Sequence, residues 1–584
     1  MRNSKMRDKT GKYLLSTAAM LAVVATVASI NPVVANDHDH DKDDQVTNPN
    51  KLKTATPIKH LVVVFNENRS FDHYFGTYPN ALNPEGEPRF EPARNTPTDI
   101  NNLLSNPSLL INNPNLNPAN GVGASNPFRL DRTQANTRSQ NHAYTPEQLA
   151  SDGGKMDLFP AWTGAGTAGG AGAFGTTAQV MGIFDGNTVT AFWNYAQDFA
   201  MSDNMWGDTF GPSTPGLLNM FAGQTNGIVV GAGSSSNELP DGQGGITLIG
   251  DVDPTFDVCS SKTSNVSLNA KNIGDLLNGA NIPWGSFYGG FNLQTINANG
   301  TTGCARSTVS PVIGVAITDY IPHHIWNQYF TSTANPNHLR PTSTKAIGHT
   351  LVPGTSTVDP ANHNYDLDDF FTAVGSGNFP AVSFIKLAAF QDEHPGNSDP
   401  LDAQTGVVNL INFLQQQPDW ESTAVIITYD DSDGWYDHAF VPPAHGSFST
   451  ATQNVRNNGG PAIPVAADEL NGVGVCGTPG TAPNGVKGLP VNGRCGVGPR
   501  LPLLLISPFA KRNAVDHDLS NQASMINFVE YNWGLPGIPG SVDQAEAATD
   551  ASEGVPFDLA GMFQLSGKKA GKLFLSPSTG QKQP

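Results

Sequence analysis

Two pairs of oxygen-bearing side chains stand directly after apolar, β-branched runs of this sequence. Glu67 and Asn68 form the first pair, and Asp430 and Asp431 form the second. Adjacent carboxylates repel each other, and a bound cation turns that repulsion into chelation. Oxygen donors suit a hard or borderline divalent ion better than a thiolate-preferring one. The pattern therefore predicts a site for a divalent metal ion of unknown identity, and the alternative for Asp430 and Asp431 is a solvated acidic turn.

A nucleophile could come from the segment Gly-Pro-Ser-Thr-Pro at residues 211–215. Pro215 suits the first turn of a helix, so the segment is typical of a loop that enters a helix. A hydroxyl at such a place lies near the positive end of the helix dipole, which attracts phosphate. With a metal ion alongside, the pKa of the hydroxyl falls and an alkoxide nucleophile can form. The alternative is an ordinary helix N-cap.

Four histidines could act on a phosphate: His142, His323, His324 and His394. The unperturbed pKa of histidine lies near neutrality, so its side chain can give a proton to a leaving alcohol. Activity that depends on such protons would be favoured at mildly acidic pH. A lone histidine is more often structural, and only the set as a whole indicates phosphate chemistry.

The elements that must position these residues follow from the apolar patterning. Short β-branched runs predict central strands at 59–65, 227–231, 282–288, 380–386, 423–429 and 501–506. Predicted helices lie at 216–223, 269–278, 403–416 and 521–532. Strands that alternate with helices favour an α/β fold with a largely parallel sheet. Ligands of such sheets collect at the carboxyl ends of the strands, where Glu67 and Asp430 are expected.

Several segments carry a specific wording: ENRSFDHYFG from Glu67, GPSTP from Gly211, DEHPG from Asp392 and TYDDSDGWYDH from Thr428. They resemble the bacterial phosphoesterase family of phosphatidylcholine-type phospholipases C and secreted acid phosphatases. That family is a branch of the alkaline-phosphatase-like hydrolases. The likeness spans roughly residues 57–540 in separated blocks. It implies an α/β three-layer sandwich with a mainly parallel central sheet and long loop insertions.

The resemblance also implies roles for individual residues. Ser213 matches the family's nucleophile, which gives a phosphoseryl intermediate, and Thr214 is the alternative. The implied metal ligands are Glu67, Asn68, Ser213, Asp430 and Asp431. The implied substrate contacts are Asn68, His142, His323, His324 and His394, and the last three are candidates for protonating the leaving alcohol. Gly216 stands where the family usually has Asn, so a local side-chain contact is absent.

Two substrate classes fit the resemblance. Phospholipases C of the family often have Thr as nucleophile and extra C-terminal β-domains, so Ser213 and the end of the chain at residue 584 favour an acid-phosphatase-like enzyme. Phospholipase C is the alternative. A metal- or phosphate-binding protein without turnover is a further alternative. A sulfatase is disfavoured because the Cys/Ser-x-Pro-x-Arg signature is absent around Ser213.

The chain divides into four parts by composition. Basic residues, an apolar core from Tyr13 to Ile30 and the small residues before Ala35 predict a signal peptide at 1–35. A membrane anchor is the alternative, although the segment is short for a span. We expect a disordered polar tail at 36–56, the phosphoesterase catalytic domain at 57–540 and a frayed C-terminal tail at 541–584.

Cysteine content indicates the cellular compartment of the protein, and net charge limits its possible partners. Four cysteines fit disulfides in an exported protein, periplasmic or extracellular, and nearest-neighbour pairing would join Cys259 to Cys304 and Cys476 to Cys495. Four cysteines allow other connectivities too. The net charge of −19 disfavours nucleic acid and anionic membranes as partners. The expected partner is a phosphate ester, a soluble monoester or a phospholipid, with no stable membrane anchor.

Overall fold

The computed structural model describes residues 47–164, 173–233, 235–542 and 555–584. The predicted signal peptide at 1–35 lies outside these residues, as do residues 36–46 of the predicted disordered tail. Residues 47–56 of that tail are ordered: Pro49–Lys51 form a 3₁₀ helix, and Thr56 is buried and donates its hydroxyl hydrogen bond to Asn532 at 2.6 Å. Within the described ranges, every helix is too short or too polar to span a bilayer.

A large central sheet organises the fold. Its strands follow the order β13 (Asn364–Asp366), β10 (Trp284–Tyr288), β14 (Val382–Lys386), β1 (His60–Asn66), β15 (Thr423–Tyr429), β18 (Arg500–Ile506), β4 (Ala200–Trp206) and β19 (Ala514–Asp516), and β20 (Ser520–Asn521) also pairs with β4. All pairings are parallel except those of β18, which runs antiparallel to β15 and β4. The mainly parallel α/β sheet is therefore confirmed.

Strand β1 lies at the centre of the parallel part. Val64 pairs with Ile385 of β14 on one side and with Ile427 of β15 on the other. Every residue of β1, β15 and β18 is buried. A continuous apolar run is what a strand covered on both faces requires, and helices provide that cover.

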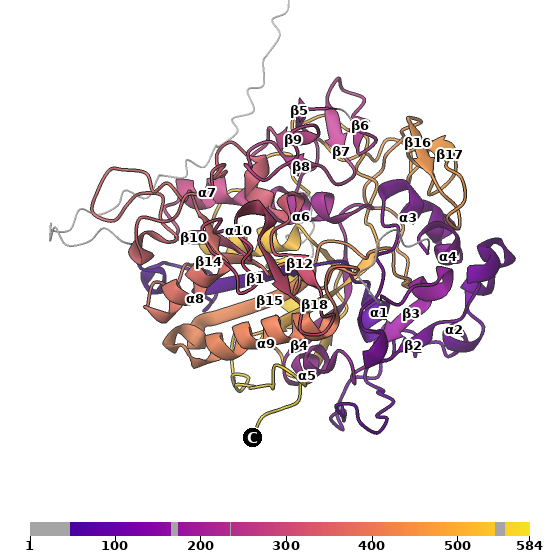
Figure 1. The fold of residues 1–584 in the computed structure, drawn as a ribbon, viewed down its shortest axis with the longest axis horizontal. Helices are drawn as coiled ribbons and strands as arrows, with labels where there is room; N and C mark the ends of the chain where they lie inside the picture. The colour runs from indigo at the N-terminus through magenta and orange to yellow at the C-terminus, as the bar shows by residue number, and fades with distance from the viewer. Residues whose placement is uncertain (1–46, 165–172, 234, 543–554) are drawn as a thin grey trace, which may run out of the picture. The chain divides into compact units, whose positions relative to one another are not determined.

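Helices flank the sheet on both sides (Figure 1). One side carries α6 (Ser213–Ala222), α7 (Ile273–Gly279) and α10 (Ser524–Trp533), and the other carries α5 (Thr190–Asp198) and α9 (Pro400–Gln416). Helix α9 begins where the side chain of Asp399 accepts hydrogen bonds from the N–H groups of Leu401 and Asp402. The result is the three-layer arrangement that the resemblance implies.

The remaining elements lie in the connections and insertions. Their helices are α1 (Phe71–Phe75), α2 (Ser108–Ile111), α3 (Tyr144–Ser151), α4 (Phe159–Trp162) and α8 (Leu367–Gly375). Their strands are β2 (Phe128–Leu130), β3 (Gly182–Phe184), β5 (Ile228–Ala232), β6 (Glu238–Pro240), β7 (Ile246–Leu248), β8 (Asp253–Pro254), β9 (Asn265–Leu268), β11 (Ser307–Val309), β12 (Ala316–Thr318), β16 (Thr452–Val455) and β17 (Ile463–Ala466). Disulfides join Cys259 to Cys304 and Cys476 to Cys495.

Two central-sheet predictions need correction. The run at 227–231 forms β5, but β5 pairs with β9 in a small separate sheet. Conversely, the sequence pattern misses β4, because Ser202, Asp203 and Asn204 interrupt its apolar residues. The side chains of Asp203 and Asn204 bond other segments instead: Asp203 accepts a hydrogen bond from the N–H of Asn101 at 2.7 Å, and Asn204 donates one to the carbonyl of His517 at 2.9 Å.

The C-terminal segment is not frayed where the structure describes it. Leu575 is fully buried, and its carbonyl accepts a hydrogen bond of 2.8 Å from the side chain of Asn412 on α9. Gln415 donates in the same way to the carbonyl of Leu573, also at 2.8 Å. Residues 573–575 therefore extend the cover over α9, which their Lys- and Gly-rich neighbours conceal in the sequence.

Candidate active site

The predicted site residues come together at one edge of the central sheet. Strands β1, β15 and β4 point the same way, so their carboxyl ends share that edge. Glu67 follows β1, Asp430 follows β15, and a loop at 207–212 leads from β4 to Ser213 at the start of α6. The strand that the sequence pattern misses is thus the one that leads to Ser213.

Ser213 lies between two carboxylates. Its Oγ is 3.0 Å from Oε2 of Glu67 and 3.1 Å from Oδ2 of Asp431, and the side chain is buried. Thr214 faces elsewhere, because its backbone N–H and its hydroxyl both donate to Oδ1 of Asp251 at 2.9 Å. The geometry therefore favours Ser213 over Thr214 as the reactive hydroxyl.

Asn68 and Asp430 complete the oxygen-rich group. Oδ1 of Asp430 accepts hydrogen bonds from the N–H of Asn68 at 3.0 Å and from that of Asp431 at 2.8 Å. Oδ2 of Asp430 and Oδ1 of Asn68 are buried without a hydrogen-bond partner. Buried polar atoms are rarely left unpaired, so these two oxygens are suited to a ligand that the protein itself does not supply.

The residues present fit a divalent cation. Burial, and then the nearby charge of Asp392, raise the pKa of Glu67 to about 7 despite the attraction of Lys386. Burial and neighbouring carboxylates raise the pKa values of Asp430 and Asp431 well above the usual range. A cation among these carboxylates would remove the repulsion that raises their pKa values. Glu67, Asn68, Ser213, Asp430 and Asp431 provide an oxygen donor set of the kind that hard divalent ions prefer.

Lys386 is a site residue that the sequence analysis missed. It ends β14, is buried, and donates a hydrogen bond from Nζ to Oε1 of Glu67. Burial opposes its charge, but the attraction of Glu67, Asp430 and Asp392 outweighs burial and raises the pKa of Lys386. The sequence did contain a signal for this role: Lys386 stands at the end of a strand that is predicted to be buried on both faces.

The four predicted histidines form one continuous cluster beside Glu67. The rings of His142 and His394 are 6.1 Å apart, those of His394 and His324 are 5.9 Å apart, and those of His324 and His323 are 4.5 Å apart. Nδ1 of His324 is 3.0 Å from Oε1 of Glu67, and its Nε2 is buried without a hydrogen-bond partner. The structure thus brings together all the histidines that the sequence singles out.

Their charges differ with their partners. Burial opposes protonation of His142, but the attraction of Asp431 and Asp433 outweighs it and raises the pKa of His142 well above its usual value. Nδ1 of His142 lies 3.0 Å from Oδ1 of Asp433. Burial lowers the pKa of His394 to about 4 and also lowers that of His324 well below its usual value. The cluster therefore holds both charged and neutral imidazoles.

A second group of ligand atoms, from Glu67, His324 and His394, lies within 4.8 Å of one another. Because Lys386 already binds Oε1 of Glu67, this group is less suited to a further cation than the oxygen-rich set around Ser213.

Glu147 of α3 connects the loop before Ser213 with the loop after Asp431, and the sequence analysis missed it as well. It is buried and accepts hydrogen bonds from the N–H of Gly211 at 2.9 Å and from the hydroxyl of Ser432 at 2.8 Å. Gly211 lies two residues before Ser213, and Ser432 follows the Asp430–Asp431 pair. Gly211 has a φ of +115°, a backbone conformation that favours glycine. One carboxylate thus fixes both loops.

Gly216 allows α6 to approach the site closely. A Cβ at this position would lie 2.0 Å from the carbonyl oxygen of Asp430. An Asn, which the resemblance leads one to expect here, would require α6 to move away from Asp430. The glycine therefore belongs to the local packing of this chain.

Comparisons with known proteins agree with this geometry. A model of the phosphoesterase family matches residues 58–536. Phospholipase C A of Mycobacterium tuberculosis is 24% identical over 500 residues, which cover 82% of this chain and 74% of that protein. The non-hemolytic phospholipase C of Burkholderia pseudomallei is also 24% identical, over 533 residues that cover 90% of this chain and 61% of that protein.

Among solved structures, murine ectonucleotide pyrophosphatase/phosphodiesterase 5 matches with a TM-score of 0.27 and 10% identity, over 60% of this chain and 91% of that one. This similarity is too low to carry an argument. The family assignment rests on the match across residues 58–536. By that match the chain belongs to the phosphoesterase family and is a hydrolase acting on phosphoric ester bonds.

Proposed function

We propose that this protein is an exported, metal-dependent phosphoesterase in which Ser213 attacks phosphorus and forms a phosphoseryl intermediate. The observation that carries the proposal is the place of Ser213 Oγ, 3.0 Å from Glu67 and 3.1 Å from Asp431 at the first residue of α6. The positive end of the helix dipole favours negative charge at that position.

The proposed ligands of the divalent ion are Glu67, Asn68, Ser213, Asp430 and Asp431. When bound, the ion would lower the pKa of the serine hydroxyl and polarise a phosphoryl oxygen. Glu67 holds the serine through Oε2, while Lys386 and His324 hold the other carboxylate oxygen. The carboxylate is thereby fixed in orientation before substrate arrives.

The histidine cluster supplies contacts to the phosphoryl group and a proton for the leaving group. The hydroxyl proton of Ser213 passes to solvent, and Oγ bonds to phosphorus as the ester P–O bond breaks and the alcohol takes a proton from a histidine, which solvent then reprotonates. His323 is the first candidate for this donor, because Asp253 and Asp251 outweigh the effect of burial and raise its pKa. His324 and His394 are the alternatives, and burial lowers their pKa values. His142 and Asn68 contact the phosphoryl oxygens. Water then breaks the Ser213–phosphorus bond, inorganic phosphate leaves, and the hydroxyl is restored.

Replacement of Ser213 tests the mechanism. We expect Ser213→Ala to lose nitrophenyl phosphate hydrolysis by several orders of magnitude, because the nucleophile is gone. Thr214→Val is the matched control and should retain most of the activity. Mass spectrometry of acid-quenched protein should find phosphate on the Ser213 peptide of the control. Hydrolysis by Ser213→Ala near the wild-type rate would refute the mechanism.

The substrate has two candidate classes. The serine nucleophile supports an acid-phosphatase-like enzyme for soluble monoesters, whereas the two curated relatives named above are phospholipases C. Phosphate release from soluble monoesters, compared with phosphocholine release from phosphatidylcholine vesicles, decides between them. We expect the monoesters to be preferred.

The two disulfides support export, because disulfides persist in oxidising compartments. Cell fractionation that recovers the protein in the cytoplasm, with its four cysteines reduced, would contradict this part of the proposal.

A further inference from the structure

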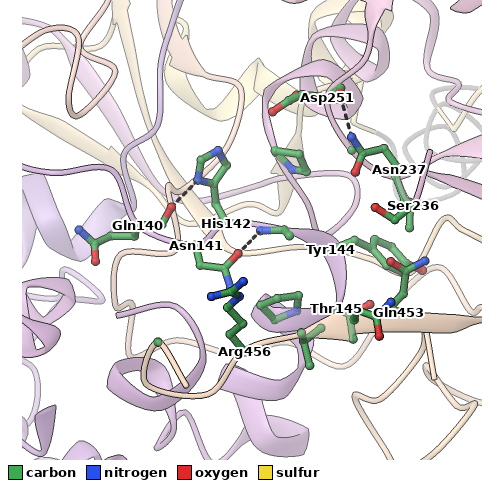
Figure 2. A pocket seen from close by; sticks show the side chains of 18 residues that line it. Gln140, Asn141, His142, Tyr144, Thr145, Ser236, Asn237, Asp251, Gln453 and Arg456 are labelled. Atoms are coloured by element: carbon green, nitrogen blue, oxygen red, sulfur yellow. Dashed lines mark hydrogen bonds between the residues drawn. The ribbon is translucent and has the colours of Figure 1, made fainter. Parts of the chain in front are cut away.

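A cavity of about 570 Å³ opens beside the proposed nucleophile. Three of its lining residues belong to the site or touch it: His142 of the histidine cluster, Pro212 before Ser213, and Asp251, which binds Thr214. Figure 2 shows His142 and Asp251 with other polar side chains around this space. A group attached to a phosphate at Ser213 would therefore extend into the cavity.

Polar side chains dominate the far part of the lining. Ser236 lies before β6, Gln453 and Asn454 lie on β16, and Arg456 follows that strand. Within the described residues, the structure gives none of these four side chains a hydrogen-bond partner. The cavity thus presents free donors and acceptors of both amide and hydroxyl type, together with a guanidinium group.

Such a lining selects a polar ligand. Apolar acyl chains would cover these groups without pairing them, and an unpaired buried polar group costs free energy. Hydroxyl groups, by contrast, can both donate to and accept from amides and serine. A carbohydrate or polyol fits this mixture, and its hydroxyls could also reach Arg456.

The rest of the surface offers little for a lipid bilayer. The large apolar side chains exposed in the described residues are aliphatic, with Tyr531 as the one aromatic and no Trp or Phe among them. Helices that lie in a membrane interface typically insert Trp, Phe or Leu; of these three residue types, only Leu is among the large apolar side chains exposed in the described residues. The net charge of −19 also opposes anionic membranes.

We propose that this cavity is the leaving-group subsite, and that it selects phosphate monoesters of polyhydroxylated alcohols, such as sugar and polyol phosphates, over phospholipids. The proposal rests on the proposed function of Ser213. Gln453, Asn454 and Arg456 act as specificity residues, because they bind the leaving alcohol and not the phosphoryl group.

The test compares substrates and subsite variants in full-length protein. Wild-type kcat/KM is measured for glucose 6-phosphate, glycerol 2-phosphate, nitrophenyl phosphate and dihexanoyl phosphatidylcholine. Gln453→Leu/Asn454→Leu and Arg456→Ala are the subsite variants. Asn95→Leu, at an exposed amide that does not line the cavity, is the matched control.

We expect the subsite variants to lower kcat/KM for the sugar and polyol phosphates by about tenfold, mainly through KM, because one or more hydrogen bonds are lost. Their activity on nitrophenyl phosphate should stay within about twofold of wild type, since the aryl group makes no such bonds. The control should match wild type on every substrate.

The outcomes separate the two proposals. A wild-type protein that hydrolyses none of the four esters overturns the proposed function and this inference with it. Hydrolysis of nitrophenyl phosphate with equal losses on all substrates in the subsite variants overturns the inference alone. The inference alone is also overturned if wild-type protein prefers the phosphatidylcholine and the subsite variants hydrolyse it at the wild-type rate.

Discussion

Lys386 binds Oε1 of Glu67, the carboxylate oxygen that does not contact Ser213. The two side chains are buried at the ends of neighbouring strands, β14 and β1. The ammonium group of Lys386 therefore faces one oxygen of the carboxylate, and the hydroxyl of Ser213, the proposed nucleophile, faces the other. Lys386 also attracts Asp430 and Asp392, so this one ammonium group compensates the charge of three buried carboxylates.

Removal of this charge should destabilise the protein and change its response to metal. We expect Lys386→Met to lower the free energy of unfolding of metal-free protein by about 3–5 kcal/mol, the usual effect of breaking a buried ion pair. The added divalent ion should then raise the unfolding midpoint more in the variant than in wild type, because one competing cation is gone. Chemical denaturation with and without Mn²⁺ measures both effects.

Two controls accompany this variant. Lys386→Arg keeps the charge, so its free energy of unfolding and its response to Mn²⁺ should lie between those of wild type and Lys386→Met. Lys155→Met removes an exposed lysine that pairs with Asp152. That variant should leave the free energy of unfolding close to that of wild type, because an exposed ion pair contributes little. An unchanged response of Lys386→Met to Mn²⁺ would show that Lys386 does not compensate the metal-binding carboxylates.

Gly216 should tolerate no side chain. Its Cβ would meet the carbonyl oxygen of Asp430 at 2.0 Å, so Gly216→Ala has to displace α6, which carries Ser213. We expect a loss of about 1–3 kcal/mol in stability from overpacking and a fall in kcat of roughly a hundredfold from misplacement of the nucleophile. Gly279→Ala, in α7 with open space around its Cβ, is the control and should retain full activity. Normal kcat in Gly216→Ala would mean that α6 can shift without moving Ser213.

Glu147 should act on catalysis through the loops that it joins. Glu147→Ala removes the acceptor for the N–H of Gly211 and for the hydroxyl of Ser432, so we expect kcat to fall by about tenfold to a hundredfold. Glu147→Gln keeps one acceptor oxygen and should restore most of the rate. Equal losses of kcat in the two variants, once both are shown to be folded, would contradict the role of Glu147 as a hydrogen-bond acceptor between the loops. Measurement of kcat and KM for nitrophenyl phosphate decides.

The sequence could predict most of the sheet, because strands covered on both faces are continuous apolar runs. β1, β14, β15 and β18 follow that pattern. β4 could not be found in this way, since its polar side chains are satisfied by segments distant in the sequence. The same limit hid the role of Lys386, whose partner Glu67 lies 319 residues away.

The site residues were more accessible to prediction than their connections. Glu67, Asp430, Ser213 and His394 stand in segments whose wording is specific. The structure brings them together with His142, His323 and His324. Glu147 carries no such signal, because its function depends on two loops that only the fold places beside α3. Roles that arise from a hydrogen bond between loops cannot be predicted from spacing along the chain.

The buried pair of His438 and Asp72 should make stability depend on pH. Burial opposes both charges, but mutual attraction outweighs it, raises the pKa of His438 and lowers that of Asp72. The contribution of His438 to the free energy of unfolding is therefore complete below its unfolded pKa of about 6.5, and it is lost as pH rises through the higher folded pKa. The contribution of Asp72 behaves in the opposite way: it is lost only as pH falls through the folded pKa of Asp72, which lies below about 4. We expect His438→Gln to reduce the free energy of unfolding by roughly 1 kcal/mol or more at pH 5–6, with a smaller loss at pH 9.

His349→Gln is a control of opposite sign, because burial lowers the pKa of His349 and its neutral form contributes above pH 6.5. Urea denaturation of both variants between pH 5 and 9 measures the trend, and a loss in His438→Gln that grows with pH would contradict the assigned charge pair.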